Sequence, residues 1–243
     1  MSSVLIIGAS SDIAQAVARK YAAQGYDLLL AGRNLDELEL LASDIRIRSN
    51  VSVKSLILDV LDFESHKTFY ESIESKPEGV VVAVGYLGDQ ALSQKAFSEA
   101  QLIINTNYTG VVSILNIIAD DFETRKRGFV IGISSVAGDR GRKSNYQYGS
   151  AKAALTAYLS GLRNRLYASN VHVLTVKPGF VNTQMTQDMD LPEKLTQEPE
   201  AVAEDIYKAQ LKKRDVLYTK WIWRWIMTVI VFIPELVFKR LSL

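Results

Sequence analysis

The sequence predicts a single α/β domain, a Rossmann-like, doubly wound parallel sheet with helices on both faces. Short apolar runs alternate along the chain with longer stretches of helical period, an order that is typical of parallel sheets. Several of these runs lack polar–apolar alternation, as expected for strands buried on both faces. The chain has 243 residues, 48% of them hydrophobic and 23% charged, which suits one domain with its own core.

Each apolar run is taken as a strand and each periodic stretch as a helix. The strands are expected at Val4–Ile7, Asp27–Ala31, Val53–Leu58, Val80–Val84, Gly128–Ser134, Val171–Pro178 and Val216–Tyr218. The helices are expected at about Asp12–Gln24, Leu35–Ser49, Phe63–Ser75, Ala96–Glu123, Tyr146–Ala168 and Glu200–Lys212. Ligands of such folds bind beyond the carboxyl ends of the strands, so the residues after each strand are the site candidates.

Composition excludes several classes of function. The chain has no cysteine, which excludes disulfides, thiolate metal sites and a cysteine nucleophile. The net charge of +1 gives no broad basic field, so nucleic acid is not an expected partner. His66 and His172 are interpreted as surface or strand residues without metal-ligand spacing, and no metal is expected. The start of the chain has no basic region and too short an apolar run for a signal peptide, which predicts a cytoplasmic protein.

The turn after the first strand, Gly8-Ala9-Ser10-Ser11-Asp12-Ile13-Ala14, is typical of a dinucleotide site. Gly8 permits a tight turn, and the amides at the start of the following helix can meet a diphosphate. Ala14 is small enough for close packing of helix on strand. Asp12 stands where a second glycine is common, and its charge would repel a diphosphate. The alternative is that Gly8 makes a simple turn and Asp12 caps the helix.

Two further strand ends bear on the cofactor. NAD sites usually place an acidic residue after the second strand, but this chain has Arg33, which can pair with a 2′-phosphate. NADP(H) is therefore favoured and NAD(H) is the alternative, unless Arg33 is only a solvated surface charge. Asp59-Val60 follows the third strand, where the carboxylate could meet the adenine amino group or simply cap a helix at the strand end.

The strongest signal is Tyr148-Gly149-Ser150-Ala151-Lys152 at the start of a long helical pattern. Residues four apart share one helix face, so the phenol and the ammonium point into the same cleft. A nearby lysine favours phenolate and should lower the pKa of Tyr148, which tunes it for acid–base catalysis. Ser135, at the end of an apolar strand, could hydrogen-bond the substrate oxygen and stabilise its developing charge.

Together with Asn107 and Pro178-Gly179-Phe180-Val181-Asn182-Thr183, this set resembles the short-chain dehydrogenase/reductase family from residue 4 to about residue 220. The resemblance implies that Tyr148 is the acid/base and that Lys152 binds the nicotinamide ribose and tunes Tyr148. It implies that Ser135 orients the carbonyl and that Asn107 bridges a relay water to Lys152. The segment with Pro178, Gly179 and Val181 resembles the nicotinamide-side loop, with Thr183 on the carboxamide.

The sequence departs from the family pattern at two places, and other segments indicate a narrower group within the family. Asp12 and Ala14 depart in the glycine turn, and the usual Asn-Asn-Ala-Gly after strand four reads Val82-Ala83-Val84-Gly85, where Gly85 and mainly backbone would line the adenosine. The segments 85–89 and 134–152 and the apolar tail are similar to the keto-reductase component of decaprenylphosphoryl-ribose 2-epimerase systems. That similarity implies a keto-sugar carried on a polyprenyl phosphate. Arg140, Arg142 and Lys143 could meet the phosphate or form a solvated loop.

Residues 221–243 are set apart as a C-terminal tail from a catalytic domain of residues 1–220. The run from Trp221 to Ile233 is nearly all apolar but too short to span a bilayer, which needs about 20 such residues. Its aromatic and basic residues suit a membrane interface; they are Trp221, Trp223, Trp225, Lys220, Arg224, Lys239 and Arg240. Peripheral contact at the cytoplasmic face is expected. The alternative is a helix in an oligomer interface, because such a segment should not lie bare in water.

Three interpretations of the function stay open. The first is a reductase for the lipid-linked keto-sugar, and the second is a reductase for a soluble ketone, sugar or acyl thioester. The third is a non-catalytic scaffold that keeps the fold and binds a partner through the tail. The segment from Gln184 to Glu200 is the expected substrate lid, and the family resemblance implies a homo-oligomer.

Overall fold

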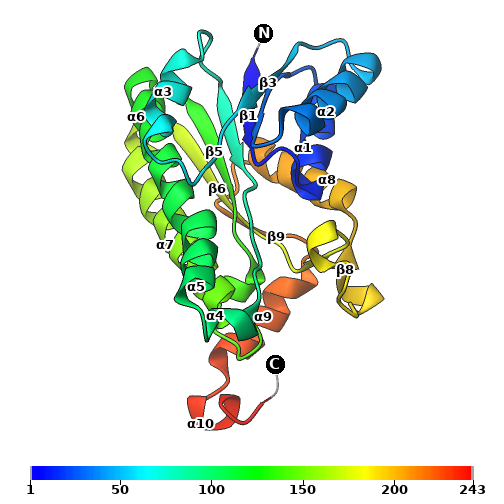
Figure 1. Ribbon diagram of the computed structural model, residues 1–243, viewed down its shortest axis with the longest axis vertical. Helices are drawn as coiled ribbons and strands as arrows, with labels where there is room; N and C mark the ends of the chain where they lie inside the picture. The colour runs from blue at the N-terminus through cyan, green and yellow to red at the C-terminus, as the bar shows by residue number, and fades with distance from the viewer. Residues whose placement is uncertain (1, 242–243) are drawn as a thin grey trace.

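The computed structural model of the protein describes residues 2–241 and confirms the predicted fold class. Its centre is a seven-stranded parallel sheet in the order β3-β2-β1-β4-β5-β6-β9 (Figure 1). The strands are β1 Ser3–Ile7, β2 Asp27–Gly32, β3 Val53–Ile57, β4 Gly79–Val82, β5 Gly128–Ile133, β6 Val171–Lys177 and β9 Val216–Tyr218. Each of the seven predicted strands is present, with ends within two residues of the prediction. A short separate pair, β7 Phe180–Val181 and β8 Thr196–Gln197, was not predicted.

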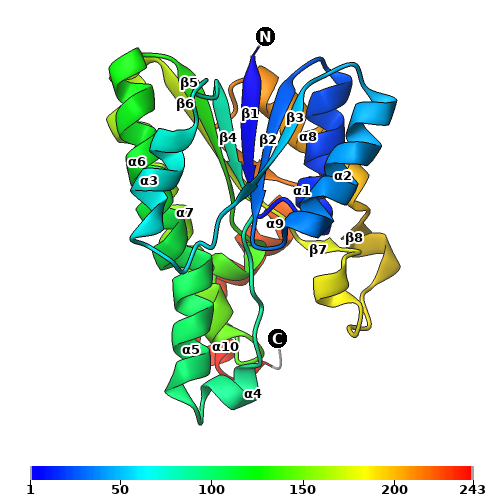
Figure 2. The same cartoon turned by 45° about the horizontal axis from the view of Figure 1, so that its top comes forward.

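Helices cover both faces of the sheet. They are α1 Asp12–Ala23, α2 Leu35–Arg48, α3 Ser65–Ser72, α4 Gln90–Ser93, α5 Phe97–Ile104, α6 Gly110–Arg125, α7 Tyr146–Leu166, α8 Pro199–Leu211, α9 Ile222–Phe232 and α10 Glu235–Phe238. Helices α1, α2 and α8 lie on one face, and α3, α6 and α7 lie on the other (Figure 2). The last two helices, α9 and α10, extend from the end of the molecule that lies opposite the N-terminus (Figure 1).

The sheet has a hydrophobic core on each face because successive side chains of a strand point to opposite sides. In β1, Val4 and Ile6 enter the core that includes Val17 of α1, whereas Leu5 and Ile7 enter the core that includes Val111 of α6. This explains why the strand reads as a continuous apolar run. All four strand residues are 1% exposed or less.

The predicted helix Ala96–Glu123 is interrupted. Its middle, Asn105–Thr109, forms a π-helical turn between α5 and α6. Such turns often occur at functional sites, and this one carries the buried Asn107. The whole helical stretch, Phe97–Arg125, is the one helix among the described residues long and apolar enough to cross a membrane by length and composition. Its α6 part packs on the sheet with Val111 and Ile114 fully buried, as a core helix does.

The strand order reverses direction between β1 and β4, which places a crevice at their carboxyl ends. The turns after β1, β4 and β5 all reach this edge. Away from it, one minor prediction is wrong: His66 is not a surface residue but is fully buried on α3, with Nδ1 2.9 Å from the Ser113 hydroxyl.

Candidate active site

The turn after β1 is built to approach a ligand closely. Gly8 has a left-handed φ of +79°, and a Cβ there would lie 3.0 Å from the Val84 nitrogen, so a larger residue would be strained and crowded. Ser11 caps α1 by accepting from the Ala14 amide at 3.4 Å. The amides of Asp12 and Ile13 precede the first intrahelical bond, and neither has a hydrogen-bond partner in the described part of the chain. Ser10, next to them, is exposed.

Asp12 does not cap the helix, because Ser11 does, so the alternative of an Asp12 cap is wrong. The Asp12 carboxylate instead accepts a hydrogen bond at 2.8 Å from the backbone amide of Gln184, at the start of the expected lid. Asp12 and Gln184 also line a polar hollow of about 590 Å³ between α1, α8 and the lid. The carboxylate is therefore directed to the lid, which reduces its repulsion of a diphosphate at the helix amides.

The other cofactor candidates lie at neighbouring strand ends. Arg33 directly follows β2, is exposed, and has no ion pair or hydrogen bond within residues 2–241. Asp59 accepts from the Leu61 amide at 3.0 Å and so closes a local turn; α3 begins only at Ser65, so Asp59 is not its cap. Val60 is 8% exposed beside it.

Ser135, Tyr148 and Lys152 meet at the end of β5. The Ser135 side chain lies close enough to the Tyr148 phenol to lower its pKa, and the Lys152 nitrogen lies 5.7 Å from the centroid of the Tyr148 ring. The lysine nitrogen donates to the carbonyls of Val84 at 3.2 Å and Ile133 at 3.0 Å. The fold thus brings three of the four residues of the predicted catalytic set close together at the carboxyl edge of the sheet.

The pKa of Tyr148 runs against the prediction. Burial raises it to about 12, although the hydrogen bond with Ser135 acts in the opposite direction. Burial also lowers the pKa of Lys152 to about 7. The expected lowering of the Tyr148 pKa is therefore wrong for this arrangement, because desolvation of the phenolate is the largest effect on that pKa and Lys152 does not act on it.

Asn107 holds the segment that follows β4. Its Oδ1 accepts from the Tyr86 amide at 3.2 Å, and its Nδ2 donates to the carbonyls of Tyr86 at 2.7 Å and Ile103 at 2.8 Å. A Cβ at Gly85 would lie 3.8 Å from this Oδ1 and 3.9 Å from the Lys152 nitrogen. Gly85, Asn107 and Lys152 therefore surround one small space.

The loop after β6 forms the opposite wall. The Pro178 carbonyl accepts from the Val136 amide at 3.0 Å, Val181 is buried in β7, and Thr183 caps the short turn Gln184–Thr186. This turn brings Met185 to 3.3 Å from a Cβ at Gly85. Sequence reasoning missed Met185, because nothing in the spacing of a lid residue shows which part of the cleft it covers.

The C-terminal helix contributes a second residue that the sequence did not place here. The Trp223 indole packs directly on Gly179: a Cβ there would lie 1.9 Å from the indole nitrogen. The prediction that Arg140 meets a phosphate is wrong, because its guanidinium is bound to carbonyls at the end of α9 and to Glu235. Arg142 has a buried Nε without a partner among the described residues.

Comparisons with known proteins agree with this geometry. A family model described as short chain dehydrogenase matches residues 2–194. The chain is 36% identical over 241 residues to an uncharacterized oxidoreductase of Mycobacterium tuberculosis, covering 98% of this chain and 96% of the relative. It is 31% identical over 242 residues to one of Streptomyces coelicolor, covering 98% and 95%.

Solved structures share the fold. A short-chain dehydrogenase from Sphingobium yanoikuyae in complex with NADPH superimposes with a TM-score of 0.85, at 23% identity and 97% of each chain. An alcohol dehydrogenase from Thermococcus sibiricus complexed with 5-hydroxy-NADP superimposes with a TM-score of 0.77, at 26% identity, over 90% of this chain and 96% of that one.

Proposed function

Because this chain belongs to the short-chain dehydrogenase family and is thus an oxidoreductase, we propose that it is a carbonyl reductase or secondary-alcohol dehydrogenase that uses NADP(H). NAD(H) is the alternative cofactor. The observation that carries the proposal is that Ser135, Tyr148 and Lys152 lie close together at the carboxyl edge of the sheet. A scaffold without activity gives no reason for a buried lysine beside a phenol whose pKa is raised.

The residues at this edge fit a dinucleotide. The free amides of Asp12 and Ile13 can receive the diphosphate, and the tight turn at Gly8 brings backbone close to it. Arg33 is exposed and unpaired within residues 2–241, as a reader of a 2′-phosphate would be. The related structures from Sphingobium yanoikuyae and Thermococcus sibiricus hold NADPH and 5-hydroxy-NADP, which supports the same cofactor class here.

When bound, the nicotinamide would supply the hydride, and the residues of the chain would bind the substrate oxygen and deliver the proton. Ser135 orients the carbonyl by donating to its oxygen, and Tyr148 gives that oxygen a proton. A phenol whose pKa is about 12 stays protonated at neutral pH and is ready to act as the acid. We assign Lys152 to the nicotinamide ribose, and Asn107 holds the nearby backbone of Tyr86.

Tyr148→Phe tests this assignment. The variant should lose turnover by at least about 100-fold, the scale of a positioned acid, while it still binds NADPH in a fluorescence titration. Tyr146→Phe is the matched control, because Tyr146 lies on the same helix and is exposed. Substantial turnover by Tyr148→Phe, or binding of neither NADPH nor NADH by the wild type, contradicts the proposal. Tighter binding of NADH would replace NADP(H) by NAD(H).

The substrate we propose is a keto-sugar on a polyprenyl phosphate, met by a cytoplasmic enzyme at the membrane surface. The support is the exposed apolar face of α9, which adjoins the lid through Trp223 and Leu195. With Arg140 engaged elsewhere, Arg142, whose buried Nε has no hydrogen-bond partner within residues 2–241, is the residue of that loop that we propose for a phosphate. A soluble ketone, sugar or acyl thioester is the alternative, and a homo-oligomer that covers α9 is the alternative to the membrane.

A further inference from the structure

The C-terminal segment, defined here as residues 220–238, contacts both walls of the proposed substrate site. On the lid side, the Trp223 indole donates to the Leu195 carbonyl at 3.1 Å, and Lys220 donates to the Thr196 carbonyl at 2.8 Å. Trp223 also packs edge-on against Phe180, with ring centroids 5.0 Å apart. These contacts belong to a small hydrophobic cluster that also contains Val136, next to Ser135.

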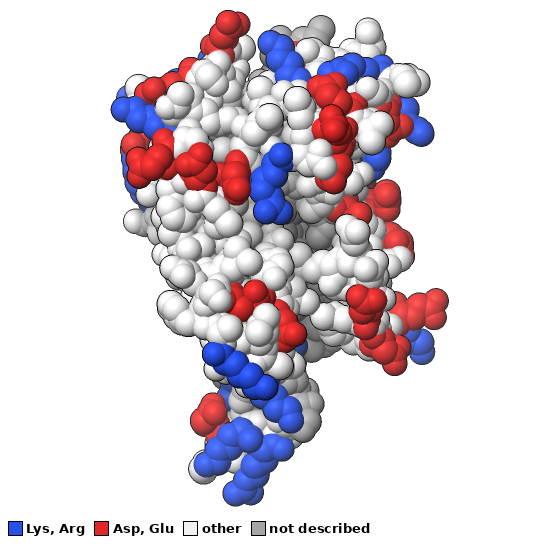
Figure 3. Space-filling view, in the orientation of Figure 1, with Lys and Arg blue, Asp and Glu red and all other residues white. Residues whose placement is uncertain are grey.

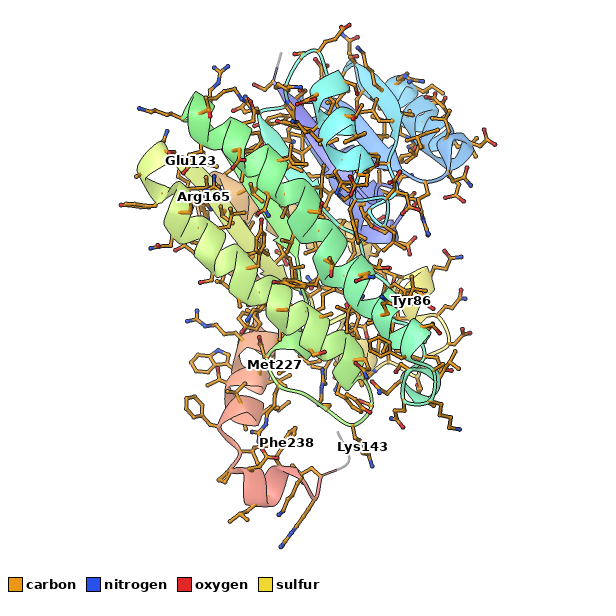
Figure 4. All side chains as sticks on the ribbon, turned by 60° about the vertical axis from the view of Figure 1, so that its left-hand side comes forward. Tyr86, Glu123, Lys143, Arg165, Met227 and Phe238 are labelled. Carbon is orange, nitrogen blue, oxygen red and sulfur yellow. The ribbon has the colours of Figure 1, made fainter. Side chains whose placement is uncertain are left out.

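Arg140 fastens the same segment to the loop that precedes Tyr148. Its guanidinium carbon lies 3.7 Å from the centroid of the Phe238 ring, and Nη2 is 2.8 Å from the Glu235 carboxylate. Nη1 donates to three carbonyls at the end of α9, those of Ile230, Val231 and Ile233, at 2.7, 3.0 and 2.6 Å. The last carbonyls of a helix have no hydrogen-bond partner within the helix. Here Arg140 alone supplies the donors for three carbonyls at the end of α9. Figure 4 shows Lys143 of this loop and Phe238 at the same end of the molecule.

The loop that precedes Tyr148 packs without free space against α7, the helix that carries Tyr148 and Lys152. A movement of this loop should therefore shift α7. A Cβ at Gly138 would lie 2.8 Å from backbone atoms of Lys152 and Ala153. A Cβ at Gly149 would lie 2.8 Å from the Ala137 carbonyl. Asp139, between Gly138 and Arg140, accepts from the Tyr218 hydroxyl at 2.8 Å. A shift of residue 140 therefore moves the backbone that touches Lys152.

We infer that Arg140 is a positioning residue and that, through it, the C-terminal segment forms part of the catalytic apparatus. The inference rests on the proposed function, because turnover is its readout. It does not involve the diphosphate turn, since within residues 2–241 the side-chain hydrogen bonds, ion pair and ring contact of Arg140 all go to residues 230–238. Release of the segment should therefore reduce kcat and leave NADPH binding unchanged.

The test measures three quantities on Arg140→Ala in the full-length chain. All three tryptophans, Trp221, Trp223 and Trp225, lie in the tail, so their emission reports its docking. We expect a red shift of that emission, a loss of about tenfold or more in kcat for NADPH-dependent reduction of diacetyl, and a Kd for NADPH within about twofold of wild type. Arg140→Lys keeps the charge without the planar fork and should restore only part of kcat.

Arg125→Ala is the matched control. Arg125 also binds a carbonyl (Pro77, 2.9 Å), a carboxylate (Asp121, 2.7 Å) and an aromatic face (Phe122, 4.9 Å), but at the far end of α6. It should cost stability and leave emission and kcat unchanged. A red shift without loss of kcat, a loss of kcat without a red shift, or no change in either contradicts the inference. Absence of turnover by the wild type with every carbonyl tested contradicts the proposed function instead.

Discussion

Lys152 is the residue whose chemistry the fold changes most. Its side chain is 2% exposed, and its nitrogen donates to two backbone carbonyls, of Val84 and Ile133. It has no carboxylate partner within residues 2–241, so burial lowers its pKa from 10.5 to about 7. The burial of Lys152 without a carboxylate partner therefore lowers the stability of the folded chain.

The cost predicts a pH-dependent effect of Lys152→Met. Between about pH 7 and 10.5 the unfolded chain holds this proton and the folded chain does not, so the free energy of unfolding of the wild type rises with pH in that window. Below pH 7 both states hold the proton, and the folded state carries the full penalty. Lys152→Met, without nucleotide, should therefore be more stable than wild type at pH 7. This gap, the difference in free energy of unfolding between Lys152→Met and wild type, should decrease by about 1 kcal/mol per pH unit toward pH 9.5.

Urea unfolding from pH 7 to 9.5 measures the gap. Lys177→Met is the control: that lysine is also buried but is paired with Asp139, so its loss should destabilise the chain throughout by leaving a carboxylate unpaired. A gap for Lys152→Met that does not change with pH would show that Lys152 is not discharged in the folded chain.

At the scale of elements, the sequence predicted features that depend on neighbouring residues, such as strands and helix faces. It did not predict contacts between residues far apart along the chain. Apolar runs located strands such as β1, β4 and β5, because a strand buried on both faces is apolar along its whole length whatever its partners are. The spacing of four residues predicted that Tyr148 and Lys152 lie on one face of a helix, because helix geometry depends only on the local sequence. The partners of Arg140 are some 90 residues away along the chain, so no local pattern shows them. The sign of the Tyr148 pKa shift was also missed, since it depends on burial that only tertiary packing decides.

The packing of α9 on the loop after β6 predicts the effect of Gly179→Ala. The added Cβ would lie 1.9 Å from the Trp223 indole nitrogen, so the indole must move and lose its bond to Leu195. We expect a red-shifted tryptophan emission and a loss of about 1–3 kcal/mol in stability, typical of overpacking. Gly161→Ala, where nothing lies within 4 Å, should instead stabilise helix α7 by about 1 kcal/mol. Unshifted emission in Gly179→Ala would show that Trp223 does not rest on this loop.

At the scale of the whole molecule, charge and apolar surface are distributed unevenly. On the face shown in Figure 3, Lys and Arg side chains gather at the end occupied by α10. Arg224, Lys239 and Arg240 of the tail are exposed, and between them α9 exposes Trp225 at 64% and Phe232 at 79%. Apolar side chains flanked by cations are the pattern that binds anionic lipid. An interface between two copies of the chain would bury the apolar side chains, but it would not explain the cations that flank them.

Vesicle flotation separates the membrane from the oligomer. The full-length protein should float with vesicles that contain phosphatidylglycerol and release from them as salt rises. The double variant Trp225→Glu, Phe232→Glu should stay behind, because each substitution sets a carboxylate where apolar surface must enter the interface. Ile47→Glu on α2, at a site 86% exposed, is the matched control and should float. If the wild type does not float, and the double variant instead converts an oligomer into monomer in sedimentation, α9 is an interface between copies of this chain and the lipid-linked substrate loses its support.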